Sequence, residues 1–289
     1  MNPRTDTDTD TGTSSPTRHG GLLGDPLPRA VADYYAAIDE SRFEEAACAF
    51  SDDVLYAVPA ADVIETESRQ ETEGRAALLA RFEERGPRPW THDVLLCTVE
   101  GSSCLVEGVS RTADTDEAWA SFAASMQLDD GGLVQRYLAY MCTPAVALTP
   151  TDAAPREGGA TGDAAAALDR YFGALDTGAF EDAAACFSED VLYSHPPYRH
   201  TGIDGNERVV FRGRSDLLRA FEARGRQSFD HRILASIQRD SHCLLEGIVE
   251  GLPEGRTGSF VSSLTLDEDG LIRRYVSFYC EPSVRRART

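Results

Sequence analysis

The side chains in this sequence best suited to proton transfer are histidines, whose charge can change near neutral pH. The segment YSHPPYRH, residues 193–200, holds His195 and His200 among tyrosines and prolines, and His231 follows later in the chain. Each imidazole could act as a general acid or base toward a bound molecule. Two histidines and a carboxylate could instead hold a metal ion, but the spacing of these three matches no metal-binding motif. We therefore expect acid–base chemistry without a metal or another cofactor.

The composition argues against several classes of partner. The 289 residues include 48 acidic and 28 basic ones, which gives a formal net charge of −20. This charge argues against binding to nucleic acid and to an anionic membrane surface. All 28 basic residues are arginine, which excludes lysine Schiff bases and lysine-containing phosphate loops. A hydrophobic content of 42% predicts a packed core.

The cysteines and the N-terminus indicate a compartment. The seven cysteines form no Cys-x-x-Cys pair, which is typical of reduced thiols rather than of a disulfide framework or a zinc site. No apolar run approaches the ~18 residues of a membrane span. The acidic N-terminal stretch has no apolar core and matches neither a secretory signal nor a transit peptide. We expect a cytoplasmic protein with a disordered acidic tail over residues 1–26.

The elements that position these side chains occur twice, because the chain contains an internal repeat. Residues 34–59 align without gaps on residues 171–196, with fourteen of 26 positions identical. The block GRAALLARFEERG (74–86) matches GRSDLLRAFEARG (213–225), and GLVQRYLAYMCTP matches GLIRRYVSFYCEP near the end of each copy. A stretch rich in Pro, Gly, Thr and Asp separates the copies and predicts a linker over residues 145–163.

Each copy shows the same predicted order of elements. Apolar residues at helical spacing predict a first helix over 28–40 and 165–177. A short helix, a strand through DVLYAVP or DVLYSHP, and a third helix in the GR…RG block follow. Four more strands come last, with hairpin turns at Gly131–Gly132 and Asp269–Gly270. This order predicts an α+β fold.

The motifs Y-x-x-A-[IL]-D-x-x-x-F, F-S-x-D-V-L-Y, G-R-x-x-L-L and G-L-x-x-R-Y resemble the nuclear transport factor 2-like superfamily, in its SnoaL-like or ketosteroid-isomerase-like branch, as a tandem duplication. The resemblance implies two tandem cone-shaped domains, over residues 27–144 and 164–283, with a short tail over 284–289. Each cone would be a curved antiparallel sheet wrapped around helices, with a pocket in its mouth. Single-domain relatives pair through the outer faces of their sheets, which implies an intramolecular pseudo-dimer of the two repeats.

The resemblance also implies which residues face each pocket. In ketosteroid isomerases the catalytic base precedes a proline at the end of the first strand, a place held by His195 in the second repeat and Val58 in the first. Strand alternation then turns further side chains inward. At four inward positions the second repeat is polar and the first is apolar: His195 against Val58, Ser262 against Ala124, Ser277 against Ala139, and Tyr279 against Met141. We therefore expect the first pocket to be degenerate and filled, and the second to be functional.

Scytalone dehydratase, which shares the fold, pairs an aspartate near the first helix with a histidine that opens the second long strand. Asp176 and His231 hold the matching places, and His195 would be a second proton carrier. We expect substrate contacts from the second repeat's Tyr171, Tyr193, Tyr198, Ser262, Tyr275, Ser277 and Tyr279. The first repeat has the equivalents Tyr34, Asp39, Tyr56, His92 and Tyr137, which we expect to be structural. Because the Asp–His pair recurs in both repeats, it could also be a structural tie in both.

Two functions fit these observations. The first is a cofactor-independent acid–base enzyme, a cyclase, dehydratase or isomerase, acting on a small apolar oxygenated metabolite such as a polyketide or terpenoid intermediate. The second is a non-catalytic small-molecule-binding or interaction protein of the same fold. This function is favoured because neither repeat has the oxyanion-stabilising carboxylic acid of the ketosteroid isomerases, whose place is held by Ala124 and Ser262. By strand alternation, Glu107 and Glu246 point away from the cones, toward an interface or solvent.

Overall fold

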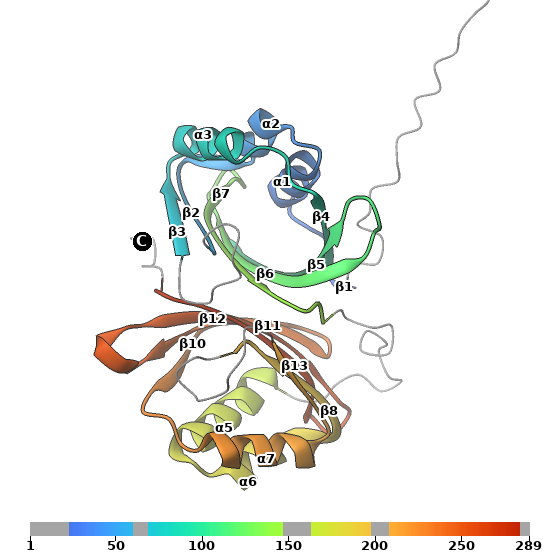
Figure 1. The fold of residues 1–289 in the computed structure, drawn as a ribbon, viewed down its shortest axis with the longest axis vertical. Coiled ribbons are helices and arrows are strands. Elements are labelled where there is room, and N and C mark those ends of the chain that lie inside the picture. The colour runs from blue at the N-terminus through green and yellow to red at the C-terminus, as the bar shows by residue number, and fades with distance from the viewer. Residues whose placement is uncertain (1–22, 60–68, 147–162, 198–207, 284–289) are drawn as a thin grey trace, which may run out of the picture.

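Each repeat folds into helices and a curved sheet that wraps around them (Figure 1). The computed structural model describes residues 23–59, 69–146, 163–197 and 208–283. The helices of the first repeat are α1 (Arg29–Asp39), α2 (Phe43–Cys48) and α3 (Arg75–Arg85). Its strands are β1 (Leu23–Gly24), β2 (Phe50–Pro59), β3 (Arg69–Glu73), β4 (Trp90–Glu100), β5 (Ser103–Thr112), β6 (Ala118–Leu128) and β7 (Val134–Cys142).

The second repeat has the same order of elements. Its α-helices are α5 (Ala164–Thr177), α6 (Phe180–Ala185) and α7 (Arg214–Arg224), with a short 3₁₀ turn η2 (Pro253–Gly255). Its strands are β8 (Phe187–His195), β9 (Val209–Arg212), β10 (Asp230–Arg239), β11 (His242–Glu250), β12 (Gly258–Leu266) and β13 (Ile272–Cys280). The internal repeat in the sequence is therefore a repeat of structure, and the α+β class is confirmed.

The first helix of each repeat lies inside the curve of its sheet because one face of it is apolar. In α1 the buried residues include Val31, Tyr34 and Ile38, spaced three or four apart. In α5 the corresponding side chains of Leu168, Tyr171 and Leu175 are buried in the same way. These contacts place a tyrosine of each first helix in the interior of its cone.

The sheets are mixed rather than purely antiparallel, which corrects the sequence-based expectation. β4 to β7 form an antiparallel meander, but β7 then pairs in parallel with β2, and β13 pairs in parallel with β8. Parallel neighbours need a long connection, and here β3, α3 and the meander lie between the two parallel strands in the chain. The final strand can therefore close against the first and complete the cone.

Residues 23–26, which the sequence assigns to the disordered tail, belong to the folded body. Leu23 and Gly24 form β1, which pairs with β4. The Asp25 carboxylate accepts a hydrogen bond from the backbone N–H of Val99 at 2.7 Å and pairs with Arg239 of the second repeat at 2.7 Å. These contacts satisfy part of the otherwise open edge of the sheet. Residues 1–22, most of the predicted linker (147–162) and the tail 284–289 lie outside the described residues.

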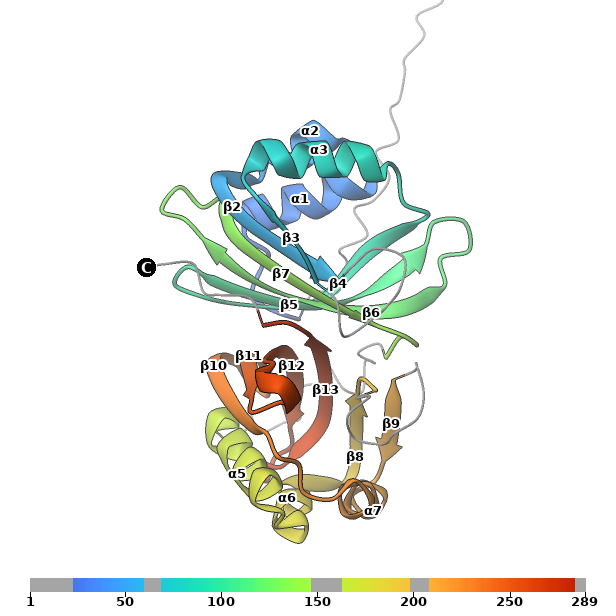
Figure 2. The ribbon, with the colours of Figure 1, turned by 60° about the vertical axis from the view of Figure 1, so that its left-hand side comes forward.

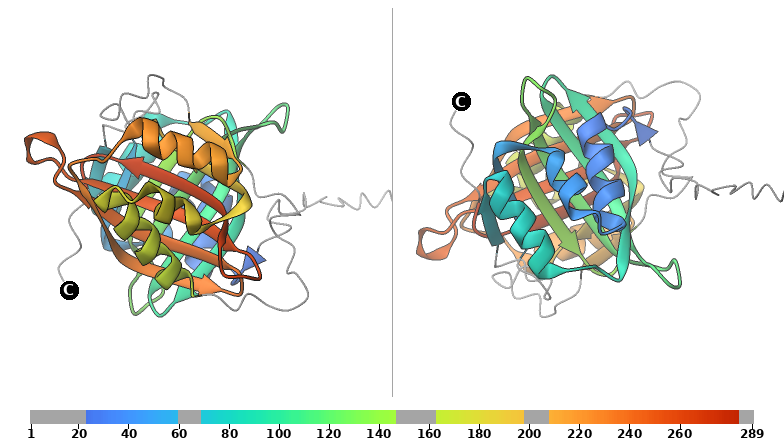
Figure 3. Two further views of the ribbon diagram at one scale, coloured as in Figure 1. Left: turned by 90° about the horizontal axis from the view of Figure 1, so that it is seen from below. Right: turned by 90° about the horizontal axis from the view of Figure 1, so that it is seen from above.

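The two sheets pack back to back, with the helices at opposite outer ends of the molecule (Figures 1 and 2). Viewed along the long axis, the helices of each repeat lie across the face of the sheet that is turned away from the other repeat (Figure 3). Apolar side chains fill the space between the sheets, among them Leu138 and Tyr140 from β7 and Val276 and Phe278 from β13. The expected pseudo-dimer within one chain is therefore what the structure shows.

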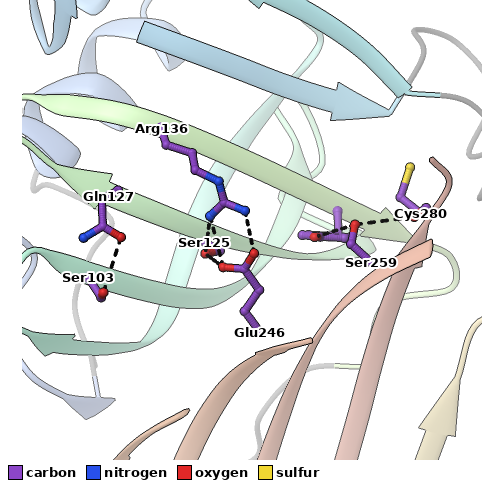
Figure 4. Close-up of polar contacts among 8 residues, drawn as sticks. Ser103, Ser125, Gln127, Arg136, Glu246, Ser259 and Cys280 are labelled. Atoms are coloured by element: carbon purple, nitrogen blue, oxygen red, sulfur yellow. Dashed lines mark hydrogen bonds and ion pairs between the residues drawn. The ribbon is translucent and has the colours of Figure 1, made fainter. Parts of the chain in front are cut away.

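Two reciprocal ion pairs cross this interface. Arg274 donates to both carboxylate oxygens of Glu107, at 2.5 and 3.1 Å. Arg136 donates to both oxygens of Glu246, at 2.5 and 3.0 Å, and Figure 4 shows this second pair. Glu107 and Glu246 occupy equivalent places in the two repeats, as do Arg136 and Arg274, so each repeat contributes one carboxylate and one guanidinium. The expectation that both glutamates point away from the cones is confirmed, and the interface is where they lie.

Candidate functional site

The first repeat contains an open cavity of about 340 Å³. Side chains from α1, β2, α3, β4, β6 and β7 line it, so the whole cone contributes to one space. The lining residues are Tyr34, Ile38, Asp39, Tyr56, Val58, Pro59, Arg81, Arg85, Arg88, Trp90, His92, Trp119, Phe122, Tyr137, Ala139, Tyr140 and Met141. The volume lies at the lower end of the ~300–1,000 Å³ that is usual for small-molecule sites.

An aspartate holds a histidine at the wall of this cavity. Asp39 ends α1, and its carboxylate accepts the backbone N–H of His92 at 2.8 Å and Nδ1–H of the same residue at 2.6 Å. Two bonds from one residue fix both the strand and the imidazole ring. Because Nδ1 is engaged, Nε2 is the nitrogen left to meet a molecule in the cavity.

Three phenols face the same cavity and bond to neighbouring phenols. Tyr34 and Tyr56 lie 3.0 Å apart at their hydroxyls, and Tyr137 lies 3.2 Å from Tyr35. Burial raises the pKa of Tyr34 and of Tyr137 well above the usual value, so both stay neutral and keep a proton to donate. The rings of Tyr56 and Tyr137 stack with their centroids 4.9 Å apart, which keeps this polar wall rigid.

The corresponding space in the second repeat is almost closed. Its cavity measures about 10 Å³, room for roughly one water molecule at most. The prediction that the first cone is the filled one is therefore wrong. The inward polar residues of the second repeat bond to one another: Tyr275 and Ser262 lie 2.9 Å apart at their hydroxyls, and Ser262 donates to Ser277 at 3.2 Å.

Aromatic residues close the second cone further. The His231 ring stacks on Phe172 at 4.6 Å and is flanked by Phe229 and Phe260. Tyr279 lies so close to Gly258 that a Cβ there would sit 2.2 Å from the phenol oxygen. The first repeat has Met141 in place of Tyr279 and Tyr35 in place of Phe172.

A comparison with protein families identifies the second repeat. The model of the SnoaL-like domain family matches residues 168–275, most of the second repeat. The second repeat is a SnoaL-like domain of the nuclear transport factor 2-like superfamily. The first repeat shares its sequence motifs and its order of elements. No curated protein matches the chain.

Solved structures of single-repeat length resemble parts of the chain. A ketosteroid isomerase candidate from Kribbella flavida is 23% identical and covers 42% of this chain and 81% of its own, with a TM-score of 0.31. A polyketide cyclase candidate from Sinorhizobium meliloti is 18% identical and covers 39% and 94%, with a TM-score of 0.30. An LEH-like epoxide hydrolase of M. tuberculosis is 18% identical and covers 39% and 80%, with a TM-score of 0.31. Scores this low carry no argument about function.

The second repeat, which is the SnoaL-like domain, contains the same Asp–His pair as the first. Asp176 accepts the backbone N–H of His231 at 2.9 Å and its Nδ1–H at 2.7 Å. The predicted pairing is confirmed in both repeats, including the closed one. The side chain of His92 is 16% exposed and that of His231 only 7%, so the histidine of the first repeat is the more accessible one.

His195 points into the closed SnoaL-like cone, as strand alternation predicts, and lies beside Arg224 and His231. Burial, with a smaller contribution from the Arg224 charge, holds the pKa of His195 well below its usual value. The imidazole is therefore neutral near pH 7. Its role as a proton carrier stays a prediction, as do the catalytic roles of Asp176 and His231.

The predicted substrate-binding tyrosines of the second repeat lie in different surroundings. Tyr171 and Tyr193 point inward and lie 2.9 Å apart at their hydroxyls. Tyr279 donates to Glu281 at 2.6 Å and packs in the core of the repeat with Tyr275. Tyr198 lies outside the described residues, as does His200.

Sequence reasoning missed the arginines and tryptophans of the first repeat. Arg81, Arg88 and Trp119 line the open cavity, and the second repeat has Ala220, Gln227 and Thr257 at the aligned positions. The same alignment that revealed polar differences in favour of the second repeat could have found these differences in favour of the first. The four inward strand positions compared above do not include Arg81 in α3, Arg88 after that helix or Trp119 at the start of β6.

The cysteines contribute nothing to this site. Cys104 and Cys243 lie in the cores of their cones, and Cys142 and Cys280 lie at the interface, as strand alternation predicts. Burial raises the pKa of Cys243 to about 12, so its thiol is not a nucleophile. Within the described ranges, no three His, Cys, Asp or Glu side chains are grouped to hold a metal ion. None of the helices in those ranges is long and apolar enough to span a membrane.

Proposed function

We propose that the cavity of the first repeat is the site of a cofactor-independent acid–base enzyme, a cyclase, dehydratase or isomerase, that acts on a small oxygenated metabolite. The observation that carries this proposal is an imidazole held by a carboxylate at the wall of an open cavity of about 340 Å³ that phenols also line. The second repeat holds the same pair, but its described residues enclose a cavity of only about 10 Å³ there. The family supports the fold, and the chemistry is inferred from the residues.

The residues of the cavity fit proton transfer at carbon or oxygen. Nε2 of neutral His92 takes a proton from the carbon beside a carbonyl group, and the electron pair of that bond moves into the enolate. Asp39 stabilises the imidazolium that forms. Neutral Tyr34 or Tyr137 donates a hydrogen bond to the enolate oxygen. His92 then returns the proton to another carbon, or to a leaving hydroxyl group.

One observation favours a non-catalytic ligand-binding role instead. The Asp–His pair has nearly the same geometry in the closed repeat, with distances of 2.6 and 2.7 Å from Nδ1 to the carboxylate. A pair that persists without a ligand space also serves to tie the end of a helix to a strand. The open cavity could then bind a molecule without transforming it.

Hydrogen–deuterium exchange of enolisable ketones separates these two functions. The probes are 2-tetralone and a carboxylate derivative of it, followed by NMR in deuterated buffer with the full chain. The enzyme proposal expects exchange above the buffer rate, reduced by about 10²–10⁴ in His92→Gln. The same substitution at His231 is the matched comparison, because it removes an equivalent imidazole from the closed repeat. No exchange with either ketone supports binding alone, and dependence on His231 instead of His92 places the site in the second repeat.

A further inference from the structure

The cavity of the first repeat carries the opposite charge to the rest of the chain. Arg81, Arg85 and Arg88 line it, and among the described residues of its lining the only acidic one is Asp39. The whole chain has a formal charge of −20. The three guanidinium groups therefore outnumber the one carboxylate of the described lining by two. A concentration of positive charge in a concave site attracts anions.

Two of these arginines have no carboxylate partner in the described part of the chain. Arg81 donates to the Thr72 hydroxyl at 3.0 Å and to the Gln70 amide oxygen at 2.7 Å, which are both neutral acceptors. Arg85 lies over the ring of Phe82 at 5.3 Å, and its Nε is buried without a hydrogen-bond partner. Positions 81 and 85 lie one helical turn apart on α3, so the two side chains share one face of the helix.

The second repeat provides an internal comparison. Its α7 keeps Arg224 at the position of Arg85, but Ala220 replaces Arg81 and Gln227 replaces Arg88. That repeat has a cavity of only about 10 Å³. Two of the three arginines are therefore present where space for a ligand exists and absent where it does not. For Arg81 and Arg88, this pattern is expected of side chains that hold a ligand rather than of side chains that support the fold. Arg85 is kept in both repeats, and the case for it rests on its place in the lining of the open cavity and on its unpartnered Nε.

The remaining wall of the cavity suits an apolar body. Trp90 and Trp119 meet edge to face with their ring centroids 5.3 Å apart, and Phe122 and Met141 also belong to the lining. The indole N–H of Trp90 is buried without a hydrogen-bond partner among the described residues. A ligand with a flat or chain-like hydrocarbon part can rest against these rings while its polar end meets the arginines.

We propose that this cavity binds small molecules that carry a carboxylate on an apolar body, with Arg81 and Arg85 receiving the carboxylate. Guanidinium groups match the geometry of a carboxylate through paired N–H donors. The small oxygenated metabolite of the proposed function would then be a carboxylic acid, and this inference rests on that proposed function. The arginines act in binding and orientation, whereas the proton is moved by His92, which lines the same space.

Intrinsic fluorescence can test this proposal directly, because both tryptophans of the chain line the cavity. The full chain is titrated with 4-phenylbutyrate and with 4-phenylbutan-1-ol, which share a hydrocarbon body and differ in charge. Phenyl phosphate tests whether another oxyanion substitutes. We expect the carboxylate to bind at least about tenfold more tightly than the alcohol, since hydrogen bonds to charged groups are worth about that much or more. Arg81→Gln and Arg85→Gln should each remove most of this preference and leave alcohol binding unchanged.

The matched control is Arg224→Gln, which removes the arginine that corresponds to Arg85 from the closed repeat. It should leave the preference for the carboxylate intact. Equal binding of acid and alcohol, or a preference that survives both first-repeat variants, would overturn the carboxylate proposal while the cavity remains a ligand site. Tighter binding of phenyl phosphate than of the carboxylate would also overturn the stated class. Binding of none of the probes would overturn both this proposal and the proposed function.

Discussion

Replacing Arg274 by methionine removes the guanidinium that neutralises the most deeply buried carboxylate at the interface. Arg274 and Glu107 are each 1% exposed at their side chains. The two bonds from Arg274, at 2.5 and 3.1 Å, are the only ones that Glu107 receives from side chains in the described residues. Methionine fills a similar space but donates nothing, so the variant leaves a charged group buried between two sheets.

The expected loss follows from this burial. Removing one partner of a buried ion pair costs about 3–5 kcal/mol. This is a large part of the ~5–15 kcal/mol that stabilises a typical domain. Replacing both partners, in Arg274→Met with Glu107→Leu, removes the uncompensated charge and should return the free energy of unfolding to within ~1 kcal/mol of the native value.

The equivalent ion pair of the pseudo-symmetric interface is more exposed, so its loss can be compared with that of the Arg274–Glu107 pair. Arg136 and Glu246 form the equivalent pair, but their side chains are 8% and 9% exposed. Glu246 also accepts a hydrogen bond from Ser125 at 2.5 Å, which remains after Arg136→Met. This variant should therefore cost less than Arg274→Met, about 1–3 kcal/mol.

Urea unfolding followed by circular dichroism measures these free energies, and tryptophan fluorescence reports the first repeat separately. Arg274→Met should be the least stable variant, Arg136→Met intermediate, and the double variant close to native. A loss under ~1 kcal/mol for Arg274→Met would refute the reasoning, because the carboxylate would then have found water or another donor. A double variant that loses as much as the sum of its single changes would refute the coupling between the two groups.

Three further outcomes are expected. The folded protein keeps His195 neutral while the unfolded chain takes up a proton below about pH 6.5. Stability should therefore fall with decreasing pH below that value by up to ~1.4 kcal/mol per unit, and His195→Val should flatten the profile seen by thermal unfolding. Deleting residues 1–22 should leave the melting temperature nearly unchanged, whereas deleting 1–26 should lower it, because Asp25 bonds Val99 and Arg239; equal melting temperatures would contradict this. Residues 164–289 expressed alone should self-associate or precipitate, since the interface that buries Val276 and Phe278 would be exposed. A stable monomer in size-exclusion chromatography would count against that interface.

The sequence alone determined the repeat, the order of elements and the direction of most side chains. These features depend on local rules: helical spacing in α1, alternation along β5 and β7, and glycine in the tight turns. Alternation correctly placed Glu107 outside the cone, and the aligned positions of Asp39 and His92 predicted a contact between the end of a helix and the start of a strand. Each of these predictions depends on the residues of a single element, or on two elements that lie side by side in relatives of the same fold.

Only the tertiary structure decided which cone is open. The volume of a cavity is a small difference between the space that a sheet encloses and the space that side chains from many elements fill, so no single element predicts it. The second repeat has the larger number of polar inward residues, and this predicted that its pocket is the functional one. In the structure, however, Ser262, Tyr275 and Ser277 bond to one another, and Tyr279 packs over Gly258. The first repeat has the smaller side chains Val58, Ala139 and Met141 at the positions of His195, Ser277 and Tyr279, and these three line its open space. Only the packed structure shows that Arg81 and Arg85 of α3 line the same space.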